Sequence, residues 1–139
     1  MLKVWGDVSR REPLSMKLNI GGAGCVALSG DGRLAVSASA DNTLKIWEVE
    51  SRRELRTLRG HTGWVRGVAL SLDGRVTVSS SEDWTLKVWE VGSGSLLTTF
   101  TCDAPALCCT LDGDYKLIVA GDAGGHVHFL RLEEPKAKG

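Results

Sequence analysis

Side chains of the types that carry out hydrolysis lie in the middle of the chain. His61 is followed by Ser79, Ser81 and Asp83. An acyl-transfer triad needs an exposed serine, a histidine base, an orienting aspartate and an oxyanion hole, and it is recognised by geometry and not by sequence order. These residue types therefore raise a hydrolase hypothesis, which depends on the elements that hold them.

A second set of side chains is of the type that binds metal ions. The set lies in the last third of the chain and comprises Cys102, Cys108, Cys109, His126 and His128. Structural zinc sites are usually built from closely spaced pairs such as Cys-x-x-Cys, and the sequence has no such pair. We therefore expect no metal site. The cysteines, Cys25 included, are interpreted as reduced, buried packing residues.

Two glycine-rich segments, residues 21–24 and 121–125, invite a phosphate-binding interpretation. Neither ends in Gly-Lys-Ser/Thr and neither opens a predicted helix, so the mechanism by which a P-loop holds phosphate is missing. We interpret both segments as connections between strands, and we expect no cofactor.

The elements that must position these residues come from an internal repeat. A Leu-Lys-Val/Ile-Trp tetrapeptide recurs at intervals of 42 residues and ends at Trp5, Trp47 and Trp89. Seventeen of the 24 residues in 26–49 are identical in 68–91. A period of about 40–45 residues is typical of radial β-repeats. A third copy, residues 106–132, has diverged.

Each copy predicts short strands separated by tight turns. In the second copy the strands are expected at 65–71, 75–81 and 86–91, where apolar and polar residues alternate with a period near two. A further strand precedes each copy, at 13–18, 54–58 and 96–101. Hairpin turns are expected at Asp31-Gly32, Asp73-Gly74 and Asp112-Gly113, because Asp-Gly supplies the positive φ that they need. With no helical periodicity in the chain, the sequence predicts an all-β fold.

Composition narrows the function classes. The chain has 139 residues and a formal net charge of zero, so it has no general attraction for nucleic acid or anionic membranes. We interpret the arginines at 10–11, 52–53, 56 and 59 as solvated charge on strand edges. No export signal and no run of about 18 apolar residues is present. We therefore predict a soluble, cytoplasmic protein that binds neither nucleic acid nor membrane.

The second copy carries the marks of a known repeat. These marks are Gly60-His61, Asp73-Gly74, the serines from Ser79 to Ser81, Asp83 and Trp89-Glu90. With the 42-residue period, they resemble the WD40 repeat, in which a Gly-His pair, a serine-rich strand, a turn aspartate and a closing Trp-Asp recur. The resemblance covers nearly the whole chain and implies β-propeller blades. Departures from the pattern are the closing Trp-Glu pairs, Leu18-Asn19 in place of Gly-His, and Gly124 and Leu130 in place of the aspartate and tryptophan.

The resemblance also assigns the polar residues of the second copy. It implies a hydrogen-bonded chain within one blade from His61, Ser79 or Ser81, Asp83 and Trp89. The serine, histidine and aspartate are then structural and not catalytic. The first and third blades, which lack parts of this set, are expected to rely on packing alone.

The same resemblance predicts a binding surface. In propellers of this family, the loop before the first strand and the turn between the second and third strands reach one face. In the second copy these segments carry Trp64, Arg66 and Trp84, and Trp and Arg are common interface anchors. The equivalent positions in the first copy are Gly22, Gly24 and Asn42. We predict that a protein or peptide partner binds at these three side chains.

The repeats divide the chain into a partial blade, three repeats and a tail. The boundaries are residues 1–19 for the partial blade, with an inner strand at 2–5, then 20–61, 62–103 and a degenerate 104–132 for the repeats, and 133–139 for a charged tail. Propellers usually need about four to eight blades, so about three four-stranded blades predict an incomplete propeller. The last repeat resembles the C-terminal end of WD40 arrays on bacterial signalling NTPases of the NACHT and AAA type.

We therefore predict a non-catalytic protein–protein interaction scaffold or sensor module, and no enzyme. The missing blades are expected from a longer propeller or from a homo-oligomer that exchanges an outer strand, since unpaired strand edges readily pair with other chains. The alternative is a truncated structural remnant of a longer WD40 array with no independent function.

Overall fold

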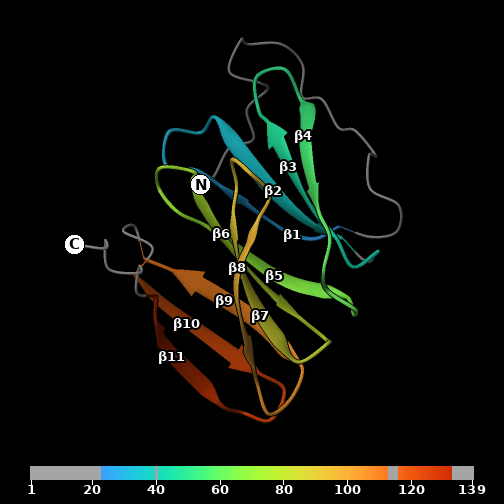
Figure 1. Cartoon of the computed structure of the whole chain (residues 1–139), viewed down its shortest axis with the longest axis vertical. Coiled ribbons are helices and arrows are strands. Elements are labelled where there is room, and N and C mark those ends of the chain that lie inside the picture. Colours follow the sequence, from blue (N-terminus) through green and yellow to red (C-terminus); the bar gives the residue numbers. More distant parts are fainter. Residues whose placement is uncertain (1–22, 40, 113–115, 133–139) are drawn as a thin grey trace, which may run out of the picture.

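Three antiparallel β-sheets follow one another in a fan (Figure 1). The computed structural model describes residues 23–39, 41–112 and 116–132. The first sheet contains β1 (Ala23–Leu28), β2 (Leu34–Ser39), β3 (Leu44–Glu48) and β4 (Arg53–Leu58). The second contains β5 (Val65–Leu70), β6 (Val76–Ser81), β7 (Thr85–Glu90) and β8 (Leu96–Thr101). The third contains β9 (Ala106–Leu111), β10 (Leu117–Asp122) and β11 (Val127–Arg131). All elements in these ranges are strands, and the all-β prediction is confirmed.

Within each sheet the strands pair in the order in which they follow along the chain. The predicted Asp-Gly turns join β1 to β2 and β5 to β6. Gly32 and Gly74 adopt φ values of 72° and 74°, which glycine reaches without steric cost. Asp31 and Asp73 each accept a hydrogen bond from the backbone N–H two residues later, which fixes the turn. The predicted strands at 2–5 and 13–18 lie outside the described residues.

The apolar core consists of two layers, one on each side of the second sheet. The layer between the first and second sheets is formed by Val36, Ala38, Leu44, Ile46, Leu58, Val65, Val68, Trp89 and Val91. The layer between the second and third sheets is formed by Val76, Val78, Leu86, Val88, Cys102, Ala106, Ile118 and Ala120. Every residue of β6 is buried, because this strand has a sheet on both of its faces.

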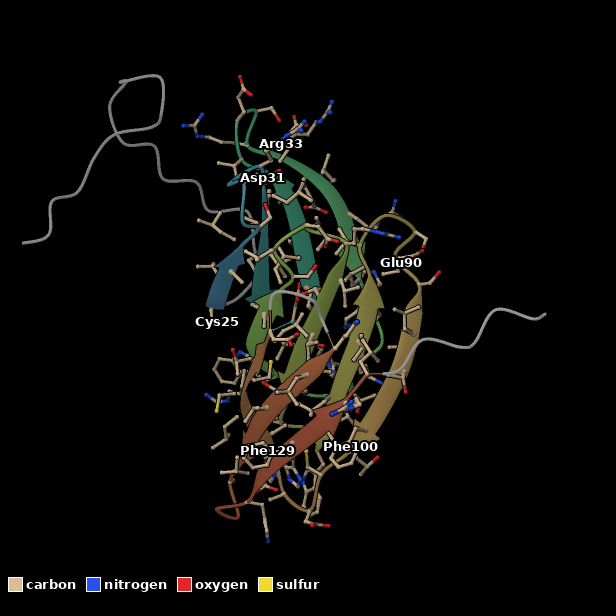
Figure 2. The ribbon with its side chains drawn as sticks, turned by 90° about the vertical axis from the view of Figure 1, so that its left-hand side faces the viewer. Cys25, Asp31, Arg33, Glu90, Phe100 and Phe129 are labelled. Carbon is tan, nitrogen blue, oxygen red and sulfur yellow. The ribbon has the colours of Figure 1, made fainter. Side chains whose placement is uncertain are left out.

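Among the described residues, nothing covers the outer faces of the first and third sheets. Val26 and Leu28 on β1 are 70% and 61% exposed. On the third sheet Leu107, Leu117, Val127 and Phe129 are exposed, and Phe129, labelled in Figure 2, reaches 71%. The stack therefore ends in apolar surface on both sides within the described residues.

Two side-chain expectations need correction. Cys108 is exposed, so the interpretation of the cysteines as buried packing residues is wrong at this position; all four cysteines are free. Arg56 is half-buried, and its guanidinium donates to the carbonyls of Gly92 and Ser93 at 2.8 and 3.2 Å. This arginine therefore ties β4 to the β7–β8 hairpin and is not simply a solvated edge charge.

Candidate functional site

A continuous hydrogen-bonded chain runs through the second sheet. His61 Nδ1 lies 2.9 Å from Asp83 Oδ2, and His61 Nε2 lies 2.6 Å from Ser79 Oγ. Trp89 Nε1 donates to Ser79 Oγ at 2.9 Å. Because a carboxylate only accepts, Nδ1 carries the imidazole proton, and Ser79 then donates to Nε2. The donors therefore follow one direction, from Trp89 to Ser79 to His61 to Asp83.

Asp83 is the end point of this chain and has further partners. Its carboxylate accepts from the backbone N–H of Thr62 at 3.0 Å, and from the N–H and hydroxyl of Thr85 at 3.0 and 2.5 Å. Ser81, the other serine that the repeat pattern offered, lies outside the chain: it donates to Gly63 O and accepts from Asp83 N. Sequence reasoning missed Thr85, although its position two residues after a turn aspartate is that of an Asx turn.

Burial and hydrogen bonding set the protonation of this pair. Burial lowers the pKa of His61 below 6.5, against the raising effect of Asp83, so the ring is neutral near pH 7. Burial raises the pKa of Asp83, but the hydrogen bonds from Thr85, His61 and Thr62 outweigh it and hold this pKa at about 2. The network is therefore a fixed arrangement of a carboxylate and a neutral imidazole.

The same geometry does not suit acyl transfer. Ser79 is completely buried between the flanking sheets, and its hydroxyl is bonded to both His61 and Trp89. A nucleophilic serine must be reachable by substrate. Because a fully satisfied polar network is rigid and a partly satisfied one is costly, we expect the serine, histidine and aspartate to stiffen the sheet.

Side-chain hydrogen bonds also occur in the other two sheets. In the first sheet Trp47 Nε1 donates to Ser37 Oγ at 2.9 Å. In the third sheet His128 Nε2 lies 2.9 Å from Asp122 Oδ2. The expectation that the first and third blades rely on packing alone is therefore wrong for both.

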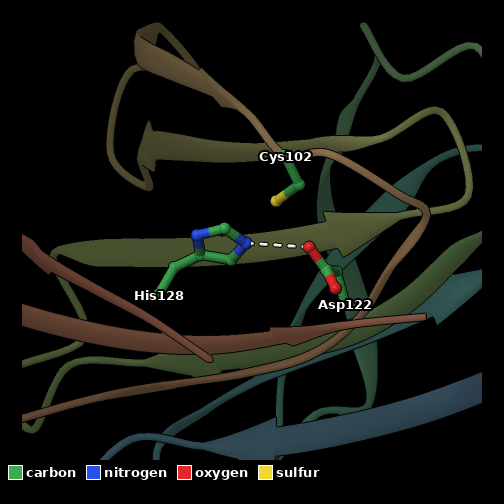
Figure 3. Close-up of side chains that lie close together, drawn as sticks. All are labelled: Cys102, Asp122 and His128. Atoms are coloured by element: carbon green, nitrogen blue, oxygen red, sulfur yellow. Dashed lines mark hydrogen bonds and ion pairs between the residues drawn. The ribbon is translucent and has the colours of Figure 1, made fainter. Parts of the chain in front are cut away.

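The pair in the third sheet lies beside a thiol. Figure 3 shows the sulfur of Cys102 pointing towards Asp122 and His128. The ligand atoms of these three residues all lie within 4.8 Å of one another. The hydrogen bond from His128 is the largest cause that lowers the pKa of Asp122, to about 2. Burial raises the pKa of the Cys102 thiol, and the nearby charges of Asp122 and Asp103 add to this effect.

Sequence reasoning named Cys102 and His128 but missed Asp122. The repeat pattern places the turn aspartate at Gly124, and the carboxylate instead stands two residues earlier, at the end of β10. Cys108 and Cys109 lie elsewhere in the third sheet: Cys108 is exposed, and the Cys109 thiol is directed to Val78 O at 3.6 Å. The structure thus brings together only part of the predicted set of metal-ligand types.

The three predicted binding residues lie at one end of the second sheet. Trp64 precedes β5 and Trp84 lies in the β6–β7 turn, and the two segments are joined by the hydrogen bond from Glu82 N to Trp64 O, 2.8 Å long. The Arg66 guanidinium lies 4.5 Å from the centroid of the Trp64 ring and pairs with the Glu82 carboxylate. Trp64 and Trp84 are 40% and 48% exposed.

A fan of antiparallel sheets braced by a Trp–Ser–His–Asp chain defines the blades of a β-propeller. The family model of the TEP-1 C-terminal beta-propeller matches residues 61–132, and the WD domain, G-beta repeat model matches residues 21–48. The chain therefore belongs to the WD40-repeat β-propeller family, whose members generally act as non-catalytic scaffolds for protein interactions.

Solved structures agree on the fold. The beta-propeller domain of Myceliophteria thermophila Cps50 (Swd1) aligns with a TM-score of 0.78 and 24% identity, over 85% of this chain and 36% of that one. This chain thus spans just over a third of the length of that domain. A search of curated proteins gave no match. Because 1195 solved chains share the fold, the fold alone does not identify a partner. In the described ranges no helix is long and apolar enough to cross a membrane.

Proposed function

We propose that this chain is a protein-interaction module whose second blade binds a protein or peptide segment at Trp64, Arg66 and Trp84. Tryptophan and arginine are the residue types most enriched among interface hot spots. The two rings and the guanidinium stand at the same end of the blade and remain accessible to solvent. We expect this module to act in the cytoplasm, where free cysteines stay reduced.

The observation that carries the proposal is the backbone conformation of Trp84. Its φ is 74°, and the equivalent turn positions of the first and third blades are Asn42, with φ 73°, and Gly125, with φ 87°. Asparagine and glycine adopt this left-handed region readily, whereas other residues lose on the order of 1–2 kcal/mol there. The Trp84 ring is not buried in compensation. Since strained residues cluster at binding sites, we infer that contact with a partner explains a tryptophan at this turn.

Trp64 and Arg66 support the proposal because they are held in place before any partner binds. Arg66 Nε donates to Glu82 Oε2 at 2.6 Å while its guanidinium stacks over the Trp64 ring. A side chain that is already ordered loses less conformational entropy on association. The Arg66 charge is met by Glu82, so we expect the partner to be recognised mainly by apolar or aromatic side chains that contact the two tryptophans.

A displayed library of random peptides tests the proposal. Selection on the native chain is expected to enrich a peptide family with apolar or aromatic anchors. The triple variant Trp64→Ala, Arg66→Ala, Trp84→Ala should lose binding to these peptides and keep its urea unfolding midpoint. The matched control is Arg33→Ala with Arg75→Ala, two exposed arginines at the opposite end of the blades, which should bind normally. Peptides that bind the triple variant as tightly as the native chain would refute the proposal.

We further propose that other blades cover the two open faces of the stack. Val26 and Leu28 on one side, and Val127 and Phe129 on the other, are apolar and exposed, as surfaces between blades would be. These blades would come either from a longer polypeptide, in which this part would serve as a sensor, or from further copies of this chain. Light scattering on the purified chain distinguishes the two. A clean dimer or trimer supports strand-exchanged copies, and a monomer or a spread of aggregates supports blades on another stretch of polypeptide.

A further inference from the structure

We infer that Cys102, Asp122 and His128 form a binding site for a zinc ion in the third blade. The three residues come from different segments: Cys102 follows β8, Asp122 ends β10 and His128 lies on β11. Their thiol, carboxylate and imidazole ligand atoms converge on one point between the second and third sheets (Figure 3). This inference is independent of the proposed partner surface, which lies on the second blade.

The spacing of the three ligand atoms suits tetrahedral coordination after small movements. Zinc bonds of about 2.0–2.3 Å place tetrahedral ligand atoms about 3.3–3.8 Å from one another. His128 Nε2 and Asp122 Oδ2 are 2.9 Å apart and would separate by about half an ångström. The longest separation in the group is at most 4.8 Å and would shorten by about 1 Å. Rotation of the side chains within their rotamer wells supplies changes of this size.

The donor set identifies the kind of ion. A thiolate, an imidazole and a carboxylate are the three ligand types that zinc takes in proteins. Magnesium and calcium require oxygen ligands almost exclusively, so the sulfur of Cys102 disfavours both. The three ligands are also largely buried: the Cys102 residue is 3% exposed, and the side chains of Asp122 and His128 are 0% and 15% exposed.

Neighbouring groups already orient two of the ligands. Asp122 Oδ1 accepts from the backbone N–H groups of Gly124 and His126, both at 3.0 Å, which leaves Oδ2 directed at His128 and Cys102. The His128 ring packs edge-on against Phe100, with the centroids 5.3 Å apart. Outer partners that fix ligand orientation in this way are a general property of metal sites.

His126 lies beside the three ligands and is exposed to solvent. His126 Nδ1 lies 3.3 Å from Asp122 Oδ1, and its side chain is 56% exposed. The ring therefore lies outside the group of three ligands and supports Asp122 from the solvent side. We assign the fourth position to a water molecule, with His126 as a positioning residue.

The second blade shows why these side chains are not simply another brace. There, Ser79 and Trp89 close the histidine–aspartate pair. In the third blade the equivalent positions, 41 residues later, are Ala120 and Leu130, which offer neither a hydroxyl nor an indole N–H. The position of His61 is taken by Cys102. The third blade has thus lost the groups that complete the brace and has a thiol at the position of the histidine.

Cobalt substitution tests the site on the purified, reduced chain. Titration with Co²⁺ is expected to give a thiolate-to-cobalt charge-transfer band that saturates at one ion per chain and is displaced by Zn²⁺. Cys102→Ser should abolish the band, and the matched control Cys108→Ser, at an exposed cysteine, should keep it. His128→Gln, which removes a ligand, should weaken binding by more than about a hundredfold, and His126→Gln, which removes an outer partner, by about 10–100-fold. The absence of the band in the native chain, or a band that survives in Cys102→Ser, would overturn the inference.

Because Cys102 also belongs to the apolar core, its serine variant can fail to fold, and a measurement on the native chain is needed as well. X-ray absorption at the zinc edge of the zinc-loaded native chain is expected to give one sulfur neighbour together with nitrogen and oxygen neighbours. A zinc shell without sulfur, or with two or more sulfurs, would contradict the assignment of Cys102, Asp122 and His128.

Discussion

The second and third blades each hold a histidine–aspartate pair, and they complete it differently. In the second blade Ser79 and Asp83 satisfy the two ring nitrogens of His61, and Trp89 donates to Ser79. Thr62 and Thr85 donate to Asp83, so the network closes inside the blade. In the third blade His128 and Asp122 pair beside a free thiol. A polar cluster is therefore structural where its groups satisfy one another by hydrogen bonds, and it can bind a ligand where some of its groups are left without such partners.

The largest effect is expected from removing the aspartate of the second blade. Asp83→Ala leaves the buried His61 Nδ1 without its acceptor, and with it the half-buried Thr85 hydroxyl and the exposed Thr62 N. The free energy of unfolding should fall by roughly 1–3 kcal/mol, the usual loss for buried polar groups left unpaired. Urea unfolding followed by tryptophan fluorescence measures this change.

Two matched variants serve as controls for the loss of unfolding free energy in Asp83→Ala. Asp73→Ala, in an exposed hairpin turn, controls for loss of a turn aspartate. Asp122→Ala should cost less than Asp83→Ala in metal-free buffer, because among the described residues the third sheet is covered on one face only. An Asp83→Ala variant as stable as Asp73→Ala would show that the network of the second blade does not brace it.

Acid should weaken the second blade through the same two groups. The folded pKa of Asp83, about 2, lies below its ordinary value of 3.8, so its contribution is complete above pH 3.8 and is lost as the pH falls towards 2. The pKa of His61 is also lower in the folded chain than in the unfolded chain. Below pH 6.5 the unfolded chain therefore binds a proton at His61 that the folded chain does not, and stability falls further. The share of Asp83 is roughly 1 kcal/mol after solvent screening.

Unfolding of the native chain and of Asp83→Asn at a series of pH values isolates this share. The stability difference between them should shrink as the pH falls from 4 to 2, since the asparagine variant lacks that titrating group. A difference that stays constant over this range would contradict the role assigned to the Asp83 carboxylate.

A smaller effect is expected in the first blade. Ser37 accepts one hydrogen bond, from Trp47, whereas Ser79 bonds both His61 and Trp89. Ser37→Ala should therefore cost about 1 kcal/mol or less, and Ser79→Ala more. Parallel urea titrations of the two alanine variants compare them directly. Equal losses would mean that His61 adds nothing to the tryptophan–serine bond.

The sequence predicted the fold well because the repeat gave both the period and the turns. The strand expected at 96–101 is β8 residue for residue, and the one expected at 65–71 differs from β5 by one residue. Positive-φ glycines stand where Asp-Gly pairs predicted them, at Gly32 and Gly74. Local turn chemistry and period-two alternation are properties of neighbouring residues, and a single sequence therefore carries them.

The parts that escaped prediction depend on contacts across the sheet. Ser37 and Trp47 bond across paired strands although the first copy lacks the usual Gly-His pair, so a missing motif residue did not remove the interaction. Asp122 replaces the expected aspartate from a position two residues earlier, where the pattern has Ser81. A motif comparison tests fixed positions only, so it could not find a histidine–aspartate pair formed by residues at two other positions of the repeat.

Measuring the stability and the peptide binding of Trp84→Asn most directly separates a role of Trp84 in partner binding from a role in stabilising the second blade. Asparagine occupies the equivalent left-handed position in the first blade, with φ 73°. We predict that the variant unfolds at the same or a higher urea concentration, with a gain of up to about 1 kcal/mol from relief of backbone strain, and that it loses the peptides selected on the native chain. A variant that binds these peptides normally, or that unfolds at markedly lower urea concentration, would contradict the view that Trp84 stands in this turn for a partner.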